Sequence, residues 1–269
     1  MRADAGGVAI HYEIEGSGTP LVLTHGLGDD LHFWDGVTPG LVAHHQVVRW
    51  DVRGFGSSDK PPGPYTPSLL AADLAAVLDA AGIKEAHVGG LSMGGVIAQR
   101  LALDAPQRVR SLVLVSTSSE VGPQGRANWQ RLADTIERRG FGDRARDASR
   151  SFSAAFAAAH PAIVAAAGAQ TARNHPAAYA AAARAMSDYQ WTDELARIAA
   201  PVLILQGLAD QLTPPGGSVK MHRRLPASRL LMIPDTGHSL PIEQPDLFTT
   251  ALLAFTGGVD ASRHLIARG

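Results

Sequence analysis

The glycine-rich run at residues 88–95 constrains the fold of this chain more than any other segment. It reads VGGLSMGG and places Ser92 between a strand-like stretch, 85–88, and a helix-like stretch, 96–103. A serine in this frame sits on a sharp strand-to-helix turn, a nucleophile elbow, with its hydroxyl pointing outward. Strand and helix pass so closely there that Cβ atoms would clash. Gly90, Gly94 and Gly95 lack a Cβ and so permit this close approach.

Short apolar runs alternate with helical segments along most of the chain. The helical spacing is clear at 69–81, where apolar residues recur on one side. Strand-type runs occur at 8–13, 21–24, 46–50, 111–115, 201–206 and 229–233. Such alternation is typical of a parallel sheet covered by helices on both faces. We therefore expect one large α/β domain with an insertion, which suits a length of 269 residues.

The sequence pattern changes between residues 121 and 189, where strand-type runs disappear and alanine and arginine dominate. We interpret 121–189 as a helical cap inserted after the sixth strand of a core formed by 1–120 and 190–269. An unrelated helical domain is the alternative, but strand-type sequence resumes at 201 and completes the core. The aromatic residues of the cap include Trp129, Phe141, Phe152 and Phe156. They are candidates to line a substrate pocket, with packing of the cap onto the core as the competing interpretation.

Composition argues against several classes of function. Lys and Arg number 24 against 25 Asp and Glu, without a basic stripe, so nothing favours nucleic acid or an anionic membrane as a partner. Cysteine is absent, which removes disulfides, thiolate metal sites and thiol nucleophiles. The chain starts without a signal-peptide pattern and has no long apolar stretch. We expect a cytoplasmic protein, and the sequence leaves its oligomeric state open.

A serine nucleophile needs a base within hydrogen-bond reach and an acid that orients the base. Asp210 and His238 follow Ser92 in the order nucleophile, acid, base, and each comes just after a strand-type run. Taken alone, the aspartate fits a turn or helix cap and the histidine fits a core or surface position. Their joint order predicts a Ser92–His238–Asp210 triad. Asp235 is the alternative acid, although it lies only three residues from His238.

The transition state of acyl transfer needs two hydrogen-bond donors for its oxyanion. The backbone N–H of Met93 is one candidate, because it begins the helix after the elbow and carries a free donor. The loop at 25–28, which reads HGLG, supplies the second candidate in the N–H of Leu27. His25 has the look of a functional residue, but we expect it to hold this loop by hydrogen bonds.

Five motifs together resemble the α/β-hydrolase superfamily across nearly the whole chain outside the cap. They are His25-Gly26, Asp51-x-Arg53-Gly54-x-Gly56-x-Ser58, Gly90-x-Ser92-x-Gly94-Gly95, Gly207-x-x-Asp210 and Gly237-His238. The resemblance implies a mostly parallel eight-stranded sheet with helices on both faces and an inserted helical cap. It also implies the same triad, the Leu27 and Met93 oxyanion hole, and no cofactor or metal.

Within that superfamily the chain looks most like 3-oxoadipate enol-lactone hydrolases and related small bacterial esterases. The resembling stretches are 58–66, 90–99, 105–117 and 243–246. The function implied is a serine hydrolase that cleaves a small-molecule carboxylic ester or lactone through an acyl-enzyme. Two alternatives use the same residues: a triad working in perhydrolysis, lyase or cofactor-free oxygenase chemistry, and a hydrolase-derived ligand receptor.

Overall fold

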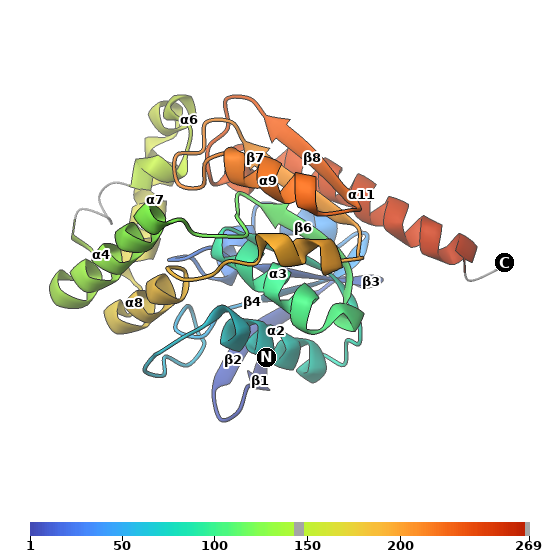
Figure 1. Ribbon diagram of the computed structural model, residues 1–269, viewed down its shortest axis with the longest axis horizontal. Helices are drawn as coiled ribbons and strands as arrows, with labels where there is room; N and C mark the ends of the chain where they lie inside the picture. The colour runs from blue at the N-terminus through green and yellow to red at the C-terminus, as the bar shows by residue number, and fades with distance from the viewer. Residues whose placement is uncertain (143–147, 267–269) are drawn as a thin grey trace.

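An eight-stranded sheet forms the centre of the computed structural model, which describes residues 1–142 and 148–266 (Figure 1). The strand order is β1-β2-β4-β3-β5-β6-β7-β8; β1 and β2 run antiparallel to their neighbours and the rest pair in parallel. The strands are β1 Arg2–Asp4, β2 Ala9–Glu15, β3 Thr19–Thr24, β4 His45–Trp50, β5 Ala86–Leu91, β6 Val109–Val115, β7 Val202–Gly207 and β8 Ser228–Ile233. The predicted mostly parallel α/β sheet is confirmed.

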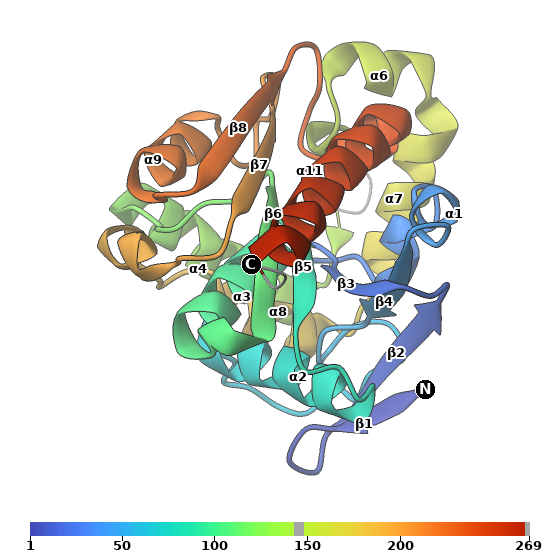
Figure 2. The same ribbon diagram turned by 90° about the vertical axis from the view of Figure 1, so that its right-hand side faces the viewer.

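Helices cover both faces of the sheet because side chains alternate along each buried strand. On β3, Val22 packs into a cluster with α2 (Pro67–Ala80) and α3 (Met93–Asp104). Its neighbours Leu21 and Leu23 pack on the opposite face with α1 (Thr38–Leu41) and α11 (Pro245–Ile266). Figure 2 shows α11 crossing the sheet in front of the strands. Each fully buried leucine of these two layers contributes about 2 kcal/mol.

Between Pro123 and Ala185, the described residues form helices joined by short non-helical stretches. An isolated antiparallel bridge between Glu120 and Gln190 joins the two ends of this segment at its base. Figure 1 shows its helices gathered at one end of the sheet. They are α4 Pro123–Arg139, η3 Ala148–Ser151, α6 Ala154–Ala159, α7 Pro161–Ala172 and α8 Pro176–Ala185. The division of the chain into core and cap remains a prediction.

Polar contacts attach these helices to each other and to the loop after β3. Arg184 of α8 forms ion pairs with Asp134 and Glu137 of α4, at 2.9 and 2.6 Å. The Asn174 side chain donates to the Gly28 carbonyl at 2.7 Å, so the segment after α7 holds the loop predicted to supply an oxyanion donor. The remaining elements are η1 Leu31–Trp34, η2 Pro106–Arg108, η4 Thr192–Arg197, α9 Gly216–Arg224 and α10 Leu240–Glu243.

The motif after β4 has a structural role in this architecture. The Asp51 carboxylate accepts hydrogen bonds from the N–H groups of Leu31 and Ser57, at 2.8 and 2.7 Å. Gly56 has a φ of +48°, and a Cβ there would lie 2.2 Å from Asp51 Cγ, so only glycine fits. Arg53 forms a buried ion pair with Asp73 of α2. The motif therefore ties the loop after β4 to the loop after β3 and to α2.

Within residues 1–142 and 148–266, no helix combines the length and apolar character needed to cross a membrane.

Candidate active site

Ser92 occupies the sharp turn between β5 and α3. Its backbone angles, φ 52° and ψ −114°, are rare for a residue with a side chain. A Cβ on Gly94 would lie 2.2 Å from the Thr24 carbonyl oxygen, and one on Gly90 would lie 2.2 Å from the Gly94 carbonyl carbon. These approaches explain the glycines of the motif, because the beginning of α3 packs directly on β5 and on the end of β3. The strained turn found here is the one predicted from the sequence.

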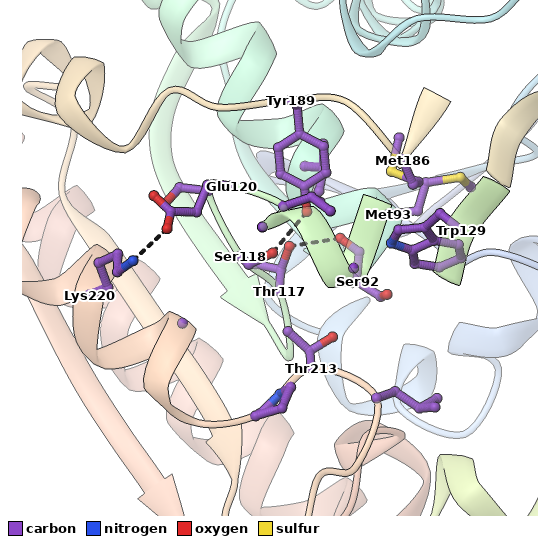
Figure 3. A pocket seen from close by; sticks show the side chains of 18 of the residues that line it. Ser92, Met93, Thr117, Ser118, Glu120, Trp129, Met186, Tyr189, Thr213 and Lys220 are labelled. Carbon is purple, nitrogen blue, oxygen red and sulfur yellow. Dashed lines mark hydrogen bonds and ion pairs between the residues drawn. The ribbon is translucent and has the colours of Figure 1, made fainter. Parts of the chain in front are cut away.

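Hydrogen bonds from the end of β6 and from the segment just after it hold the elbow in place. The Ser92 N–H donates to the Val115 carbonyl at 2.9 Å. The Thr117 hydroxyl donates to the Ser92 carbonyl at 2.8 Å (Figure 3). A Cβ on Gly95 would lie 2.6 Å from Thr117 Cβ, so the threonine also fixes how closely α3 approaches β6.

Asp210 and His238 form a buried hydrogen-bonded pair beyond the ends of β7 and β8. His238 Nδ1 donates to Asp210 Oδ2 at 2.8 Å. The other carboxylate oxygen of Asp210 accepts from the N–H groups of Leu212 and Thr213, at 2.8 and 2.9 Å. Burial alone raises the pKa of Asp210, but His238 and the two N–H groups outweigh burial and hold this pKa below its ordinary value. Asp210 is therefore an ionised acceptor that fixes the orientation of the ring.

Ser92 and His238 both line one cavity of about 710 Å³, which also reaches Gly26 and Leu27. The ring nitrogen of His238 that faces away from Asp210 forms no hydrogen bond with any residue that the structure describes, and neither does the Ser92 hydroxyl. No hydrogen bond therefore joins the two groups in this structure. Catalytic hydrogen bonds are often long in a protein without substrate and shorten in the complex. The structure thus brings the acid and the base together and places the serine on the same cavity.

The two predicted oxyanion donors lie on neighbouring segments. Met93 begins α3, where the first N–H groups have no partner within the helix. Leu27 follows Gly26, whose missing Cβ would lie 3.3 Å from the Leu91 side chain, so the loop packs beside the elbow. His25 is buried and uses both ring nitrogens on backbone, donating to the Gly26 carbonyl and accepting from the Val52 N–H. Burial lowers the pKa of His25, so this ring acts as a neutral support for the loop.

A second, narrower cavity of about 360 Å³ is also lined by Ser92. Figure 3 shows Trp129 on one side of this cavity and the ion pair between Glu120 and Lys220 on the opposite side. The hydrogen bond with Lys220 lowers the pKa of Glu120. Tyr189, which shares a 2.8 Å hydrogen bond with the Ser118 hydroxyl, lies on the same wall, and burial raises its pKa to about 12. The cavity therefore has an apolar side and a polar side.

The four aromatic residues proposed for a pocket divide into two groups. Trp129 lines both cavities and Phe152 lines the wider one. Phe141 packs edge-on against Tyr179, with ring centroids 5.2 Å apart, and lines neither cavity. Phe156 stacks on Phe152 at 5.4 Å and also lines neither. For Phe141 and Phe156 the geometry matches the competing interpretation, in which aromatic residues serve packing.

Sequence reasoning missed the polar wall of the narrower cavity. Its residues Ser118, Glu120, Tyr189 and Lys220 come from three separate segments and carry no motif. Only the sheet topology brings the segment after β6 next to α9, so no local signal was available. Among the described residues, no group of three His, Cys, Asp or Glu side chains gathers as a metal site would require.

Comparison with known proteins identifies the family of this chain. Residues 19–245 match the family model described as alpha/beta hydrolase fold. The chain therefore belongs to the α/β-hydrolase family, and the resemblance drawn from its motifs is confirmed.

Particular relatives align over nearly the full length. The protein named "Putative carbamate hydrolase RutD" from Azorhizobium caulinodans is 33% identical, over 96% of this chain and 98% of its own. The 3-oxoadipate enol-lactonase 2 of Acinetobacter baylyi is 29% identical, over 92% of both chains. The solved structure of a thermophilic esterase from Thermogutta terrifontis, with malate bound, superposes with a TM-score of 0.91. It is 31% identical, over 96% of this chain and 98% of the esterase.

Proposed function

We propose that this protein is a serine hydrolase that cleaves a carboxylic ester or lactone by a Ser92–His238–Asp210 triad. One observation carries the proposal above the others. A buried imidazole is held by an ionised aspartate at 2.8 Å, and it shares a cavity with a serine on a strained elbow. This set of groups has the chemistry of nucleophilic acyl transfer.

In the proposed mechanism, Ser92 Oγ attacks the substrate carbonyl carbon while His238 Nε2 accepts the hydroxyl proton. Asp210 keeps the other ring nitrogen protonated and stabilises the imidazolium that forms. The N–H groups of Met93 and Leu27 hold the oxyanion, each contributing about 3 kcal/mol. Collapse of the tetrahedral intermediate releases the alkoxide, which takes the proton from His238. Water, deprotonated by His238, then attacks the acyl-enzyme and releases the acid and free Ser92.

The two cavities that meet at Ser92 suit the two halves of an ester. One half of the substrate occupies the wider cavity near Leu27 and His238, and the other occupies the narrower cavity near Trp129. Residues 121–189, which we propose to act as a cap, supply walls to both and limit the access of bulk water. An esterase and an enol-lactonase among the relatives support ester and lactone substrates.

Carbamates are a second candidate class of substrate. The relative with 33% identity carries the name of a carbamate hydrolase, and a carbamate carbonyl suits the same serine attack. The acyl-enzyme would then be a carbamoyl-serine, which is hydrolysed through the same His238-activated water.

The test is a panel of short acyl esters, aryl esters, enol-lactones and carbamate esters, assayed with the wild-type protein and with Ser92→Ala. We expect hydrolysis by the wild type and its loss in the variant, together with covalent labelling of Ser92 by a fluorophosphonate. Activity retained in Ser92→Ala would defeat the triad. Labelling of Ser92 without turnover of any substrate would favour a receptor or a non-hydrolytic reaction.

A further inference from the structure

Glu243 is a buried carboxylate next to the proposed base, and the mechanism above does not use it. It ends the short helix α10, five residues after His238, and is 8% exposed. Its Oε1 accepts a hydrogen bond from the Gly237 N–H at 2.9 Å and another from the Ser153 N–H at 3.1 Å. Gly237 directly precedes His238, whereas Ser153 is the N-cap of α6, some 85 residues earlier in the chain. One carboxylate oxygen thus joins the histidine loop to the segment inserted after β6.

The two backbones joined by Glu243 are in close contact. A Cβ on Gly237 would lie 2.4 Å from the Phe152 carbonyl carbon and 2.5 Å from the Ser153 nitrogen. A further hydrogen bond runs from the Ser239 N–H to the Ser151 carbonyl at 2.8 Å. Residues 151–153 therefore pack along the histidine loop on both sides of His238, and nothing larger than glycine fits at 237.

The opposite side of the histidine loop rests on the loop that carries Asp210. The Ala209 N–H donates to the Thr236 carbonyl at 2.9 Å. A Cβ on Gly207 would lie 2.3 Å from that same carbonyl oxygen. The histidine loop is consequently held between the Asp210 loop and residues 151–153, and Glu243 supplies the side-chain contact on the second of these sides.

Residues 151–153 also form part of the substrate space. Ser151 and Phe152 line the wider cavity together with His238 and Ser239. A buried carboxylate must have its acceptor capacity satisfied by hydrogen bonds. The contact through Glu243 therefore fixes the distance between a wall of the cavity and the ring that would deprotonate Ser92.

We propose that Glu243 is a positioning residue that couples the 151–153 wall of the cavity to His238, acting by the reach of its Oε1 acceptor. The inference rests on the proposed function, since it assigns His238 the role of base. The role requires an acceptor oxygen that reaches the N–H groups of Gly237 and Ser153. A glutamine at position 243 supplies such an oxygen, whereas a shorter side chain does not reach both groups. Displacement of the loop moves the imidazole away from Ser92, which slows the chemical step more than it weakens substrate binding.

The experiment compares Glu243→Gln, Glu243→Asp and Glu243→Ala on an ester that the wild type hydrolyses in a Ser92-dependent manner. Glutamine keeps the acceptor and loses the charge, whereas aspartate keeps the charge and loses the reach. Asp246→Ala removes an exposed carboxylate three positions further on and serves as the matched control. For each variant we measure kcat, KM, the rate of Ser92 phosphonylation by a fluorophosphonate, and the thermal unfolding midpoint.

We expect Glu243→Gln and Asp246→Ala to keep a kcat near that of the wild type. Glu243→Asp and Glu243→Ala should lower kcat and the phosphonylation rate by about 10- to 100-fold with a smaller change in KM. If the alanine variant does not fold, the contrast between glutamine and aspartate carries the same test. A folded aspartate variant as fast as the wild type, or a glutamine variant as slow as the aspartate variant, overturns the role of the acceptor. A wild type without Ser92-dependent turnover or labelling instead overturns the proposed function itself, and the positioning role with it.

Discussion

Two buried histidines contact an aspartate in this molecule, one at each end of the parallel strands. His238 Nδ1 lies 2.8 Å from Asp210 Oδ2, beyond the carboxyl ends of β7 and β8. His87 Nε2 lies 3.2 Å from Asp260 Oδ1, near the amino end of β5 and against α11. By their contacts alone, the two pairs look alike.

The second nitrogen of each ring separates the two pairs. His87 Nδ1 is engaged by the Ser111 hydroxyl at 2.7 Å, and its ring packs edge-on against His45. The second nitrogen of His238 has no hydrogen bond to the described residues, and the ring borders the cavity that contains Ser92. A carboxylate contact therefore does not by itself identify a base, because the base also needs a free nitrogen that faces substrate. His87–Asp260 belongs to the packing of α11 on the sheet.

Replacing the two histidines should give the largest difference in kcat between the two pairs. We expect His238→Ala to lower kcat for the ester substrate by about a millionfold, because the serine loses its proton acceptor. His87→Gln should keep kcat near the wild-type value. Steady-state kinetics on both variants check this, and comparable losses of kcat in the two would erase the distinction.

Replacing the two aspartates tests the same difference between the pairs, with a smaller expected change in kcat. Asp210→Asn should lower kcat by about 10⁴-fold, because an amide favours the wrong tautomer of His238. Asp260→Asn removes the negative charge next to His87 and should change kcat little. The measurement is kcat of both variants and of the wild type at the same pH. A kcat of Asp210→Asn close to the wild-type value would mean that another group, such as Asp235, orients the ring.

The free energy of unfolding should depend on pH through His87. Burial outweighs the attraction of Asp260 and lowers the pKa of His87 from 6.5 to about 4. Between these values the unfolded chain binds more protons than the folded one, so stability is full above pH 6.5 and falls as the pH drops towards 4. For a shift of this size the loss reaches about 3 kcal/mol.

The check is urea unfolding at several pH values with the wild type and His87→Gln, whose amide does not titrate. The variant should have a flatter dependence of the unfolding free energy on pH between 4 and 6.5. Identical pH dependence in both proteins would assign the effect to other groups, of which the buried His45 and His25 are the first to consider, since burial lowers their pKa values too.

The smallest expected effect concerns Ser111. Ser111→Ala leaves His87 Nδ1 buried without its 2.7 Å partner and should cost about 1–2 kcal/mol of stability. It should leave kcat unchanged, because β6 carries this residue at the end far from Ser92. Thermal unfolding and kinetics on one preparation measure both quantities, and a change in kcat would link the two ends of the sheet.

The sequence predicted the sheet, the elbow and the positions of Ser92, Asp210 and His238, because each depends on a local pattern. A close strand–helix crossing leaves glycines at fixed positions, and strand ends place side chains at one edge of a parallel sheet. β1 was missed because its three residues, Arg2–Asp4, are too few for periodicity to show. The pairing of His87 with Asp260 spans 173 residues, and only the folded topology brings them together.

Glu120 and Gln190 form one isolated antiparallel bridge. The two ends of the segment inserted after β6 therefore lie side by side. Changes of length between these residues alter walls of both cavities at Ser92. They lie outside β6 and β7, whose register places Leu112 opposite Val202. Laboratory evolution of new substrate ranges can therefore confine insertions and deletions to this stretch. A stretch grafted from another member of the family needs two junctions, and it must also keep the backbone contacts that residues 151–153 make with the histidine loop.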